Sequence, residues 1–301
     1  MTKLLREIRA DFLLTLYGGG FSTMAYLSGF RPYAVYVVGS DVLLGGALKR
    51  IMSRVAFTRA SAVFISGKHL TETARRVAPG ANLHCLYLGT DVARFAPGNA
   101  TPAPVRIVCT RGFAEIYNNE FLVRALAEMP ALDVAYETIF AAPGPLLARI
   151  RILADQILTS ERRKSVQFLG GVSKHDLTNV LKSSHIYVSV SRSDGTSSSL
   201  LEGLACGLFP VLSDIPANRE WIFPGAQNGL LVPLDNHKAL ASALAQAIQN
   251  EALRVSAQSF NRKLVVDRAD DRKNIGVLSN EIESLVRGFE MKCPQLDRIH
   301  E

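Results

Sequence analysis

Short runs of β-branched and aromatic residues alternate along the chain with longer stretches whose apolar residues recur at helical spacing. The pattern predicts strands over residues 33–39, 61–66, 82–89, 105–110, 133–141, 166–170, 186–191 and 209–214. Between and after these strands it predicts helices over residues 42–57, 68–77, 119–129, 145–158, 174–184, 198–207, 237–248 and 274–290. Such alternation favours parallel βαβ units, with helices on both faces of each sheet.

One stretch, FAPGNATPAP at residues 95–104, divides this pattern in two, because proline, glycine and small polar residues are typical of a linker. We therefore expect an α/β protein with two Rossmann-like domains, over residues 1–97 and 98–273. Residues 274–301 are expected to form a helix that crosses back to the first domain. The first domain contains three of the predicted strands. We therefore expect it to be incomplete, and a partner chain could complete it.

The positive charge lies in the first third of the sequence. Residues 1–100 contain 12 Lys and Arg against 5 Asp and Glu, a net of +7, whereas the remaining 201 residues contain 22 of each. A solvated basic face explains this excess slightly better than the alternative, a surface for an anionic partner such as a phospholipid leaflet or a lipid-linked phosphate. No nucleic-acid-binding motif accompanies the charge, so we expect no nucleic-acid partner.

Membrane-spanning and metal-binding classes find little support. No apolar run reaches the roughly 18 residues that span a bilayer, and the charged start of the chain does not resemble a signal peptide. Cys85, Cys109, Cys206 and Cys293 show no paired spacing and no nearby histidine set. We expect no metal, no cofactor and a cytoplasmic location. If the basic face binds phospholipid, the protein would also contact the inner face of the membrane.

The stretch SRSDGTSSSLLEGLACG, residues 191–207, follows an apolar strand and leads into an apolar helix. A helix N-terminus offers unpaired backbone N–H groups and the positive end of the helix dipole. Small residues there let a ligand approach the backbone, which suits a diphosphate. These residues are Gly195, Thr196, Ser197, Ser198 and Ser199. Taken alone, the loop is better explained as the start of an ordinary helix, with Ser198 or Ser199 as its N-cap.

Two carboxylates favour a ligand-binding loop over an ordinary capped helix. Asp194 precedes the predicted helix, and Glu202 lies about one turn inside it among leucine and alanine residues. A buried glutamate is costly unless it accepts hydrogen bonds, which ribose hydroxyls would supply. The alternative is a partly exposed helical glutamate with no ligand.

Residues 191–222, followed by NGLLVPLDNHKALASALAQAI at 228–248, resemble the C-terminal domain of family 4 glycosyltransferases. These are retaining enzymes of the GT-B architecture. Residues 64–98 are similar to the end of a GT-B N-terminal domain and its linker, and the resemblance covers the chain from about residue 11. It implies two Rossmann-like domains with a nucleotide-sugar site in the second.

The resemblance also implies roles for individual residues. The second acidic residue of the family motif binds the donor ribose and is Glu202 here; the first supports the transition state near the donor sugar and is Asp194. The family usually has glutamate at that first position, so Asp194 is shorter by one methylene group. The backbone from Thr196 to Leu200 would cradle the diphosphate. Gly171 lies in the segment 168–177, which borders the nucleotide base.

The resemblance places two further residues near the phosphates of the donor. Arg111 matches the family arginine that neutralises the donor phosphate, the alternative being a surface arginine at a strand end. Tyr117 stands six residues later, where the family has a lysine. A phenol donates one hydrogen bond but carries no positive charge, which affects donor affinity or donor type. We predict Asp194 and Arg111 as catalytic residues and Tyr117 as part of the donor-binding set.

The first domain departs from the family more strongly. Val38 stands where the family often has a histidine before the glycine that is Gly39 here. The glycine-rich loop near the family's first strand has no counterpart, since Gly18–Gly20 lie where a later strand ends. The first βα units of the family fold are therefore expected to be missing.

The resemblance implies sugar transfer from a nucleotide-diphosphate sugar to a glycan or lipid-linked acceptor hydroxyl, with retention of configuration and without a metal. Such a reaction serves glycan, polysaccharide or glycolipid assembly. One alternative is a non-catalytic or split-enzyme subunit that binds the nucleotide sugar and depends on a partner. A nucleotide-sugar epimerase is a third, less favoured hypothesis.

Overall fold

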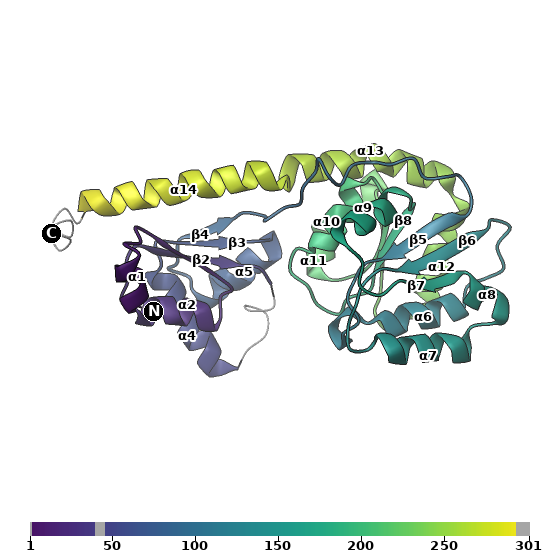
Figure 1. Cartoon of the computed structure of the whole chain (residues 1–301), viewed down its shortest axis with the longest axis horizontal. Helices are drawn as coiled ribbons and strands as arrows, with labels where there is room; N and C mark the ends of the chain where they lie inside the picture. Colours follow the sequence, from purple (N-terminus) through teal and green to yellow (C-terminus); the bar gives the residue numbers. More distant parts are fainter. Residues whose placement is uncertain (1, 40–45, 293–301) are drawn as a thin grey trace. The chain divides into compact units, whose positions relative to one another are not determined.

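The computed structural model describes residues 2–39 and 46–292. The chain forms two compact units (Figure 1). The first combines the chain up to Leu88 with the segment that starts at Asp271, and the second is Gly89–Asp270. The sequence predicts boundaries at residues 97 and 273, whereas the two units divide after Leu88 and after Asp270.

The first unit contains a parallel sheet in the order β1-β2-β3-β4. Its strands are β1 (Leu13–Leu16), β2 (Tyr33–Val37), β3 (Ala62–Ile65) and β4 (Leu83–Cys85). Every residue of β2 and β3 is buried, which explains why these two strands are continuous apolar runs. The pattern analysis missed β1, because its four residues merge with flanking apolar residues and show no period of their own.

Helices cover both faces of this sheet. They are α1 (Thr2–Glu7), α2 (Gly20–Leu27), α4 (Ala47–Arg59), α5 (Lys68–Val77) and α14 (Asp271–Lys292). Ala25 of α2, Phe57 of α4 and Leu70 of α5 share one core with β2 and β3. On the opposite face, Leu278 and Leu285 of α14 pack against strand residues. Residues 42–45 of the helix predicted over 42–57 lie outside the described residues.

The second unit contains a six-stranded parallel sheet in the order β10-β9-β8-β5-β6-β7. Its strands are β5 (Val105–Cys109), β6 (Tyr136–Phe140), β7 (Val166–Phe168), β8 (Ile186–Ser189), β9 (Phe209–Ser213) and β10 (Leu230–Val232). The chain adds strands on one side of β5 and then returns to add β8 on its other side. The order therefore reverses between β5 and β8, where open α/β sheets bind their ligands.

Helices lie on both faces of the second sheet (Figure 1). They are α6 (Asn119–Ala127), α7 (Leu147–Ile157), α8 (Ser160–Lys164), α9 (Lys174–Lys182), α10 (Ser198–Ala205), α11 (Pro216–Arg219), α12 (His237–Gln249) and α13 (Glu251–Arg268), with short 3₁₀ turns η1 (Glu115–Tyr117) and η2 (Pro224–Ala226). The prediction of an α/β protein with two parallel sheets is confirmed. The pattern missed α13, an 18-residue helix in which only Ala257, Asn261, Leu264 and Val265 are buried, so its apolar stripe is weak.

Candidate functional site

The candidate site lies at the switch point of the second sheet. β5 and β8 are neighbours, with Ile107 beside Ile186, and both run in the same direction. Arg111 follows β5 by two residues, and the loop that contains Asp194 follows β8. Because parallel strands end at the same edge of a sheet, two segments 83 residues apart in sequence meet there.

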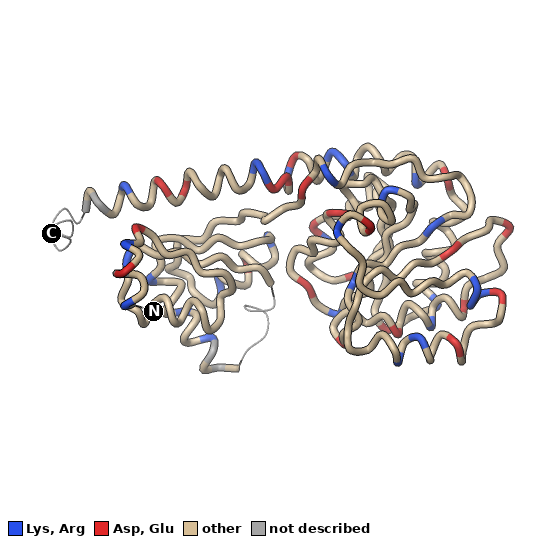
Figure 2. The backbone as a smooth tube through the Cα atoms, viewed as in Figure 1, with Lys and Arg blue, Asp and Glu red and all other residues tan. Residues whose placement is uncertain are grey.

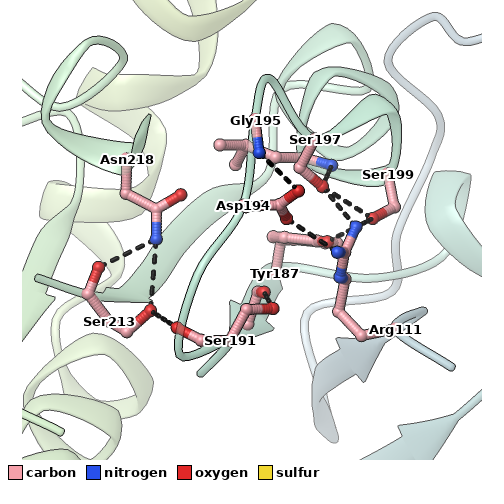
Figure 3. Close-up of polar contacts among 11 residues, drawn as sticks. Arg111, Tyr187, Ser191, Asp194, Gly195, Ser197, Ser199, Ser213 and Asn218 are labelled. Carbon is pink, nitrogen blue, oxygen red and sulfur yellow. Dashed lines mark hydrogen bonds and ion pairs between the residues drawn. The ribbon is translucent and has the colours of Figure 1, made fainter. Parts of the chain in front are cut away.

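Arg111 is the centre of this meeting point (Figure 3). Its Nη2 lies 2.6 Å from Asp194 Oδ2, and its Nη1 donates to Ser197 Oγ at 2.7 Å and Ser199 Oγ at 3.0 Å. The side chains of Arg111 and Asp194 are 11% and 19% exposed, so the ion pair is only weakly screened by water. The other carboxylate oxygen of Asp194 accepts from the backbone N–H of Gly195 at 2.9 Å.

Local capping fixes the start of α10. Ser197 is the N-cap, and its Oγ accepts from the backbone N–H of Leu200 at 3.3 Å. The expectation that Ser198 or Ser199 caps the helix was wrong. Ser198 is the first helical residue, and the hydroxyl of Ser199 is hydrogen-bonded to Arg111 instead. Ser197 Oγ therefore accepts from both the start of the helix and Arg111, which ties the guanidinium to the N-terminus of α10.

Close packing against β8 holds α10 in place. Tyr187 is fully buried and its hydroxyl donates to Ser199 Oγ at 2.9 Å. A Cβ atom on Gly203 would lie 2.9 Å from two ring atoms of Tyr187, so the helix approaches the strand as closely as a glycine permits. Sequence reasoning missed Tyr187, because an aromatic residue in a strand is normally core.

Tyr117 contacts Arg111 through its ring. The guanidinium carbon of Arg111 lies 4.2 Å from the centre of the half-buried Tyr117 ring. This is a cation–π contact, in which the ring face stabilises the guanidinium without adding charge. Tyr117 thus holds the arginine in position.

Glu202 lies in α10 apart from the Arg111 contacts. It is half-buried, and its carboxylate accepts no hydrogen bond from any residue in the described part of the chain. Burial raises the pKa of Glu202 to about 7, and the positive charge of Lys174 acts in the opposite direction. A carboxylate left without protein partners in this position is free to accept hydrogen bonds from a ligand.

The remaining predicted residues lie in two places. Thr196 belongs to the loop before α10, which also supplies Asp194 and Gly195. Gly171 is exposed in the turn between β7 and α9, where the position of a Cβ atom would be 3.6 Å from Pro143. Direct contacts therefore join four of the predicted residues to Arg111, namely Asp194, Ser197, Ser199 and Tyr117. No described contact joins Gly171 or Glu202 to it.

Arg192 and Asn118, which sequence reasoning missed, connect the loop after β8 to the segment before α6. Arg192 Nη2 donates to Asn118 Oδ1 at 2.9 Å, and the backbone N–H of Arg192 donates to Ile116 O at 2.8 Å. Asn118 is buried with φ of 55°, a left-handed conformation that asparagine tolerates. The doublet Asn118–Asn119 before a helix was the available signal, since asparagine favours such turns.

Buried hydroxyls also fix the end of β8. Ser213 Oγ donates to the carbonyl oxygen of Ser191 at 2.7 Å, and Asn218 Nδ2 donates to the carbonyl oxygen of Ser213 at 2.8 Å (Figure 3). These bonds join the ends of β8 and β9 just before the Asp194 loop. The loop therefore starts from a rigid support.

A pocket of about 200 Å³ lies at the start of α6 and α7 rather than at Arg111. Its charged lining residues are Glu115, Glu120, Arg124, Arg149 and Arg192. Glu120 pairs with both Arg124 and Arg149 there, so much of the charge is already compensated. We place the candidate site at Arg111, where a largely buried cation meets the N-terminus of α10.

Residues 118–264 match the family model described as Glycosyl transferases group 1. The matched segment lies within the second unit, Gly89–Asp270. It includes the Asp194 loop, α10 and Glu202, whereas Tyr117 immediately precedes the matched residues and Arg111 lies a few residues before them.

Curated relatives also carry glycosyltransferase names. A Salmonella typhimurium protein named after colanic acid biosynthesis, the glycosyltransferase WcaL, is 23% identical over 200 residues, covering 59% of this chain and 47% of that protein. The uncharacterized glycosyltransferase MJ1069 of Methanocaldococcus jannaschii is 25% identical over 169 residues, covering 56% of this chain and 42% of that protein. The chain thus spans about half the length of the curated relatives that it matches.

Solved structures share the fold of this chain. HepE of Anabaena, crystallised in complex with UDP, matches with a TM-score of 0.82 at 14% identity, covering 94% of this chain and 80% of that chain. Sucrose-phosphate synthase of Thermosynechococcus elongatus matches with a TM-score of 0.79 at 15% identity, covering 94% of this chain and 76% of that chain. These likenesses confirm the predicted GT-B type of fold, with two Rossmann-like sheets.

Two further observations concern the described residues alone. None of the helices within 2–39 and 46–292 combines the length and the apolar character needed to cross a bilayer. Within the same residues, no three His, Cys, Asp or Glu side chains gather so that they could hold a metal ion.

Proposed function

We propose that this chain is a glycosyltransferase that moves a sugar from a nucleotide-diphosphate sugar to an acceptor hydroxyl with retention of configuration. One observation carries the proposal: the largely buried guanidinium of Arg111 meets Asp194 and two serine hydroxyls at the N-terminus of α10. The match of residues 118–264 to the Glycosyl transferases group 1 model supports it. So does HepE, a protein of the same fold that was crystallised with UDP and with UDP-glucose.

The diphosphate would bind between Arg111 and the start of α10. Both offer positive charge, one as a guanidinium and the other as backbone N–H groups at the helix dipole. As the bond to the sugar breaks, negative charge grows on the departing diphosphate, and these fixed groups stabilise it without a metal. The acceptor proton would pass to the leaving phosphate.

The two carboxylates would hold the rest of the donor. Asp194 lies beside Arg111 and would accept hydrogen bonds from the transferred sugar. Glu202 would accept them from the ribose, because its carboxylate has no partner among the described residues. The exposed turn at Gly171 would border the base.

The acceptor and the location complete the proposal. The name of WcaL refers to colanic acid biosynthesis, which favours a glycan or lipid-linked acceptor in polysaccharide assembly. Three cysteines of the described chain, Cys85, Cys109 and Cys206, are free thiols, which favours a reducing cytoplasm.

The test is calorimetric titration of the chain with UDP-, GDP-, ADP- and dTDP-sugars. Arg111→Gln, Asp194→Ala and Glu202→Ala should each weaken binding of the preferred donor. Arg106→Gln is the matched control: it removes another partly buried arginine from the other end of the same strand, where Arg106 pairs with Glu137. Loss of binding in Arg106→Gln but not in Arg111→Gln would contradict the assignment, as would binding of no donor.

A second candidate is a nucleotide-sugar-binding subunit without its own turnover. Two contacts favour it: Asp194 neutralises Arg111, and Tyr117 adds no charge to the site. The same titrations would then show binding, while release of free sugar from the bound donor stays at the rate without protein. If a partner chain restored turnover, this second candidate would replace the first.

A further inference from the structure

The pocket at the start of α6 and α7 is lined by the two loops that also form the candidate site. It measures about 200 Å³, and residues 118–121 at the N-terminus of α6 line it together with Ala114 and Arg192. Ala114 lies in the segment that follows Arg111, and Arg192 lies two residues before Asp194. We call this cavity the α6 pocket. An occupant would contact both of the loops that meet at Arg111.

Asn118 supplies this pocket with a buried hydrogen-bond donor that has no acceptor. The residue is 7% exposed. Its Oδ1 accepts from Arg192 Nη2 at 2.9 Å, which fixes the orientation of the amide, and its Nδ2 has no hydrogen-bond partner among the described residues. Buried polar groups of native proteins are rarely left unpaired. An oxygen atom of a ligand in the α6 pocket would supply the acceptor that the protein lacks.

The N-terminus of α6 lacks its ordinary side-chain cap. An asparagine at the N-cap usually turns its side-chain oxygen toward the backbone N–H groups of the first helical turn. Here Oδ1 of Asn118 accepts from Arg192 instead, so the Asn118 side chain caps none of these groups. The helix therefore presents the positive end of its dipole at the pocket, and this end favours a negatively charged ligand.

The α6 pocket has one more arginine than it has carboxylates. Its charged residues are Arg124, Arg149 and Arg192 against Glu115 and Glu120. Figure 2 shows both basic and acidic positions along α6 and α7. Glu120 pairs with Arg124 at 2.7 Å and with Arg149 at 3.3 Å, and the side chain of Glu115 is 82% exposed. Within residues 2–39 and 46–292, no carboxylate pairs with Arg192, so this arginine is the cation that a ligand would meet.

We propose that the α6 pocket binds the anionic group of a small molecule, a carboxylate or a phosphate. Arg192 would pair with the anion, while Asn118 Nδ2 and the first N–H groups of α6 would donate to its oxygen atoms. Pockets for drug-sized ligands measure roughly 300–1,000 Å³. The α6 pocket is smaller, so a monosaccharide with one anionic group fits it better than a nucleotide does. The inference does not depend on the proposed transferase activity.

The test is calorimetric titration of the full chain with glucose 1-phosphate, with glucuronate and with neutral glucose. We expect binding of at least one of the two anions, weakened by salt, and no binding of glucose. Arg192→Gln should weaken anion binding by roughly tenfold or more, because it removes a charge-assisted hydrogen bond. Asn118→Asp keeps a residue that tolerates the left-handed backbone but replaces the amide donor with an acceptor. It should weaken binding by at least roughly the same factor.

Two substitutions serve as matched controls. Arg151→Gln removes an exposed arginine from α7 that does not line the pocket, and Asn179→Asp makes the same amide-to-carboxylate change on the exposed side of α9. Both should leave the affinity for the anion unchanged. Arg111→Gln should leave it unchanged as well, although the same substitution weakens binding of a nucleotide sugar at the candidate site. Circular dichroism checks that every variant is folded.

Three results would overturn the proposal. The first is no binding of either anion at millimolar concentration, and the second is equal binding of glucose and the anions. The third is anion binding that survives both Arg192→Gln and Asn118→Asp but is lost in Arg111→Gln. That last result would assign the anion to the candidate site at Arg111 and leave the α6 pocket without a ligand.

Discussion

At the residue scale, Arg111 organises the candidate site. One guanidinium contacts a carboxylate, two hydroxyls and an aromatic ring. Each contact is of a kind that lysine would make less well, because the planar guanidinium both stacks on a ring and donates in several directions. A phosphate that binds here must take over some of these hydrogen bonds, so the contacts set the affinity for a donor.

Tyr117 is expected to affect the donor only through its ring. Tyr117→Phe keeps the ring face against Arg111, whereas Tyr117→Leu removes it, a loss of about 0.5–2 kcal/mol for a cation–π contact. Calorimetry should therefore show a donor affinity close to wild type for the phenylalanine variant and several-fold weaker for the leucine variant. Equal affinities in all three proteins would mean that the ring does not position Arg111.

Glu202 should make stability depend on pH. Its pKa is raised from the ordinary 4.5 to about 7 in the folded chain, so the native state holds a proton that the unfolded state releases. Stability from this proton is complete below about pH 4.5 and is lost as pH rises through about 7. Glu202→Gln lacks this titration, so it should gain stability relative to wild type, by up to about 3 kcal/mol, across that range.

Urea unfolding of both proteins at about pH 5 and about pH 8 measures the effect. Each comparison is made between the two proteins at one pH, which cancels the other titrating groups. A free-energy difference that does not change with pH would show that Glu202 ionises normally in the folded chain.

At the element scale, the contact between α10 and β8 connects the core to the site. Gly203 allows the helix to lie against the ring of Tyr187, and the Tyr187 hydroxyl reaches Ser199 beside Arg111. A shift of α10 would therefore move the N-cap and the two serine hydroxyls together.

Gly203→Ala should destabilise the second unit by about 1–3 kcal/mol, because the new methyl group overlaps the buried ring. Gly276→Ala in α14 is the matched control: nothing lies within 4 Å of its Cβ position, and alanine favours the helix by up to about 1 kcal/mol. Chemical denaturation compares the two. A neutral Gly203→Ala would contradict the close packing of α10.

At the scale of the whole molecule, the first unit is discontinuous in sequence. Its sheet comes from the start of the chain, and α14 comes from the end. Leu278 and Leu285 of α14 pack with Ala34 and Tyr36 of β2. The last helix should therefore stabilise strands that lie more than two hundred residues before it.

Leu278→Ala combined with Leu285→Ala should destabilise the first unit by a few kcal/mol, since both side chains are partly buried. Hydrogen exchange should show lower protection in β2 and β3 and unchanged protection in β5 and β8. The double substitution Ile275→Ala and Val277→Ala changes two exposed positions of the same helix. It should alter neither the stability of the first unit nor the protection of β2 and β3. Equal loss of protection in both sheets would contradict two separate cores.

Sequence alone determined the strand–helix alternation, two parallel sheets and the loop between β8 and α10, because periodicity, capping residues and glycines act within a few neighbouring residues. It could not identify β1, β10 or α13, whose patterns are short or weak.

Only the tertiary structure decided which distant residues meet. Strand order brings Arg111 to Asp194, and packing selects Ser197 as the cap and leaves α2 and α4 apolar toward solvent. Contacts across 83 residues depend on how strands are ordered in the sheet, and no local pattern of residues encodes that order.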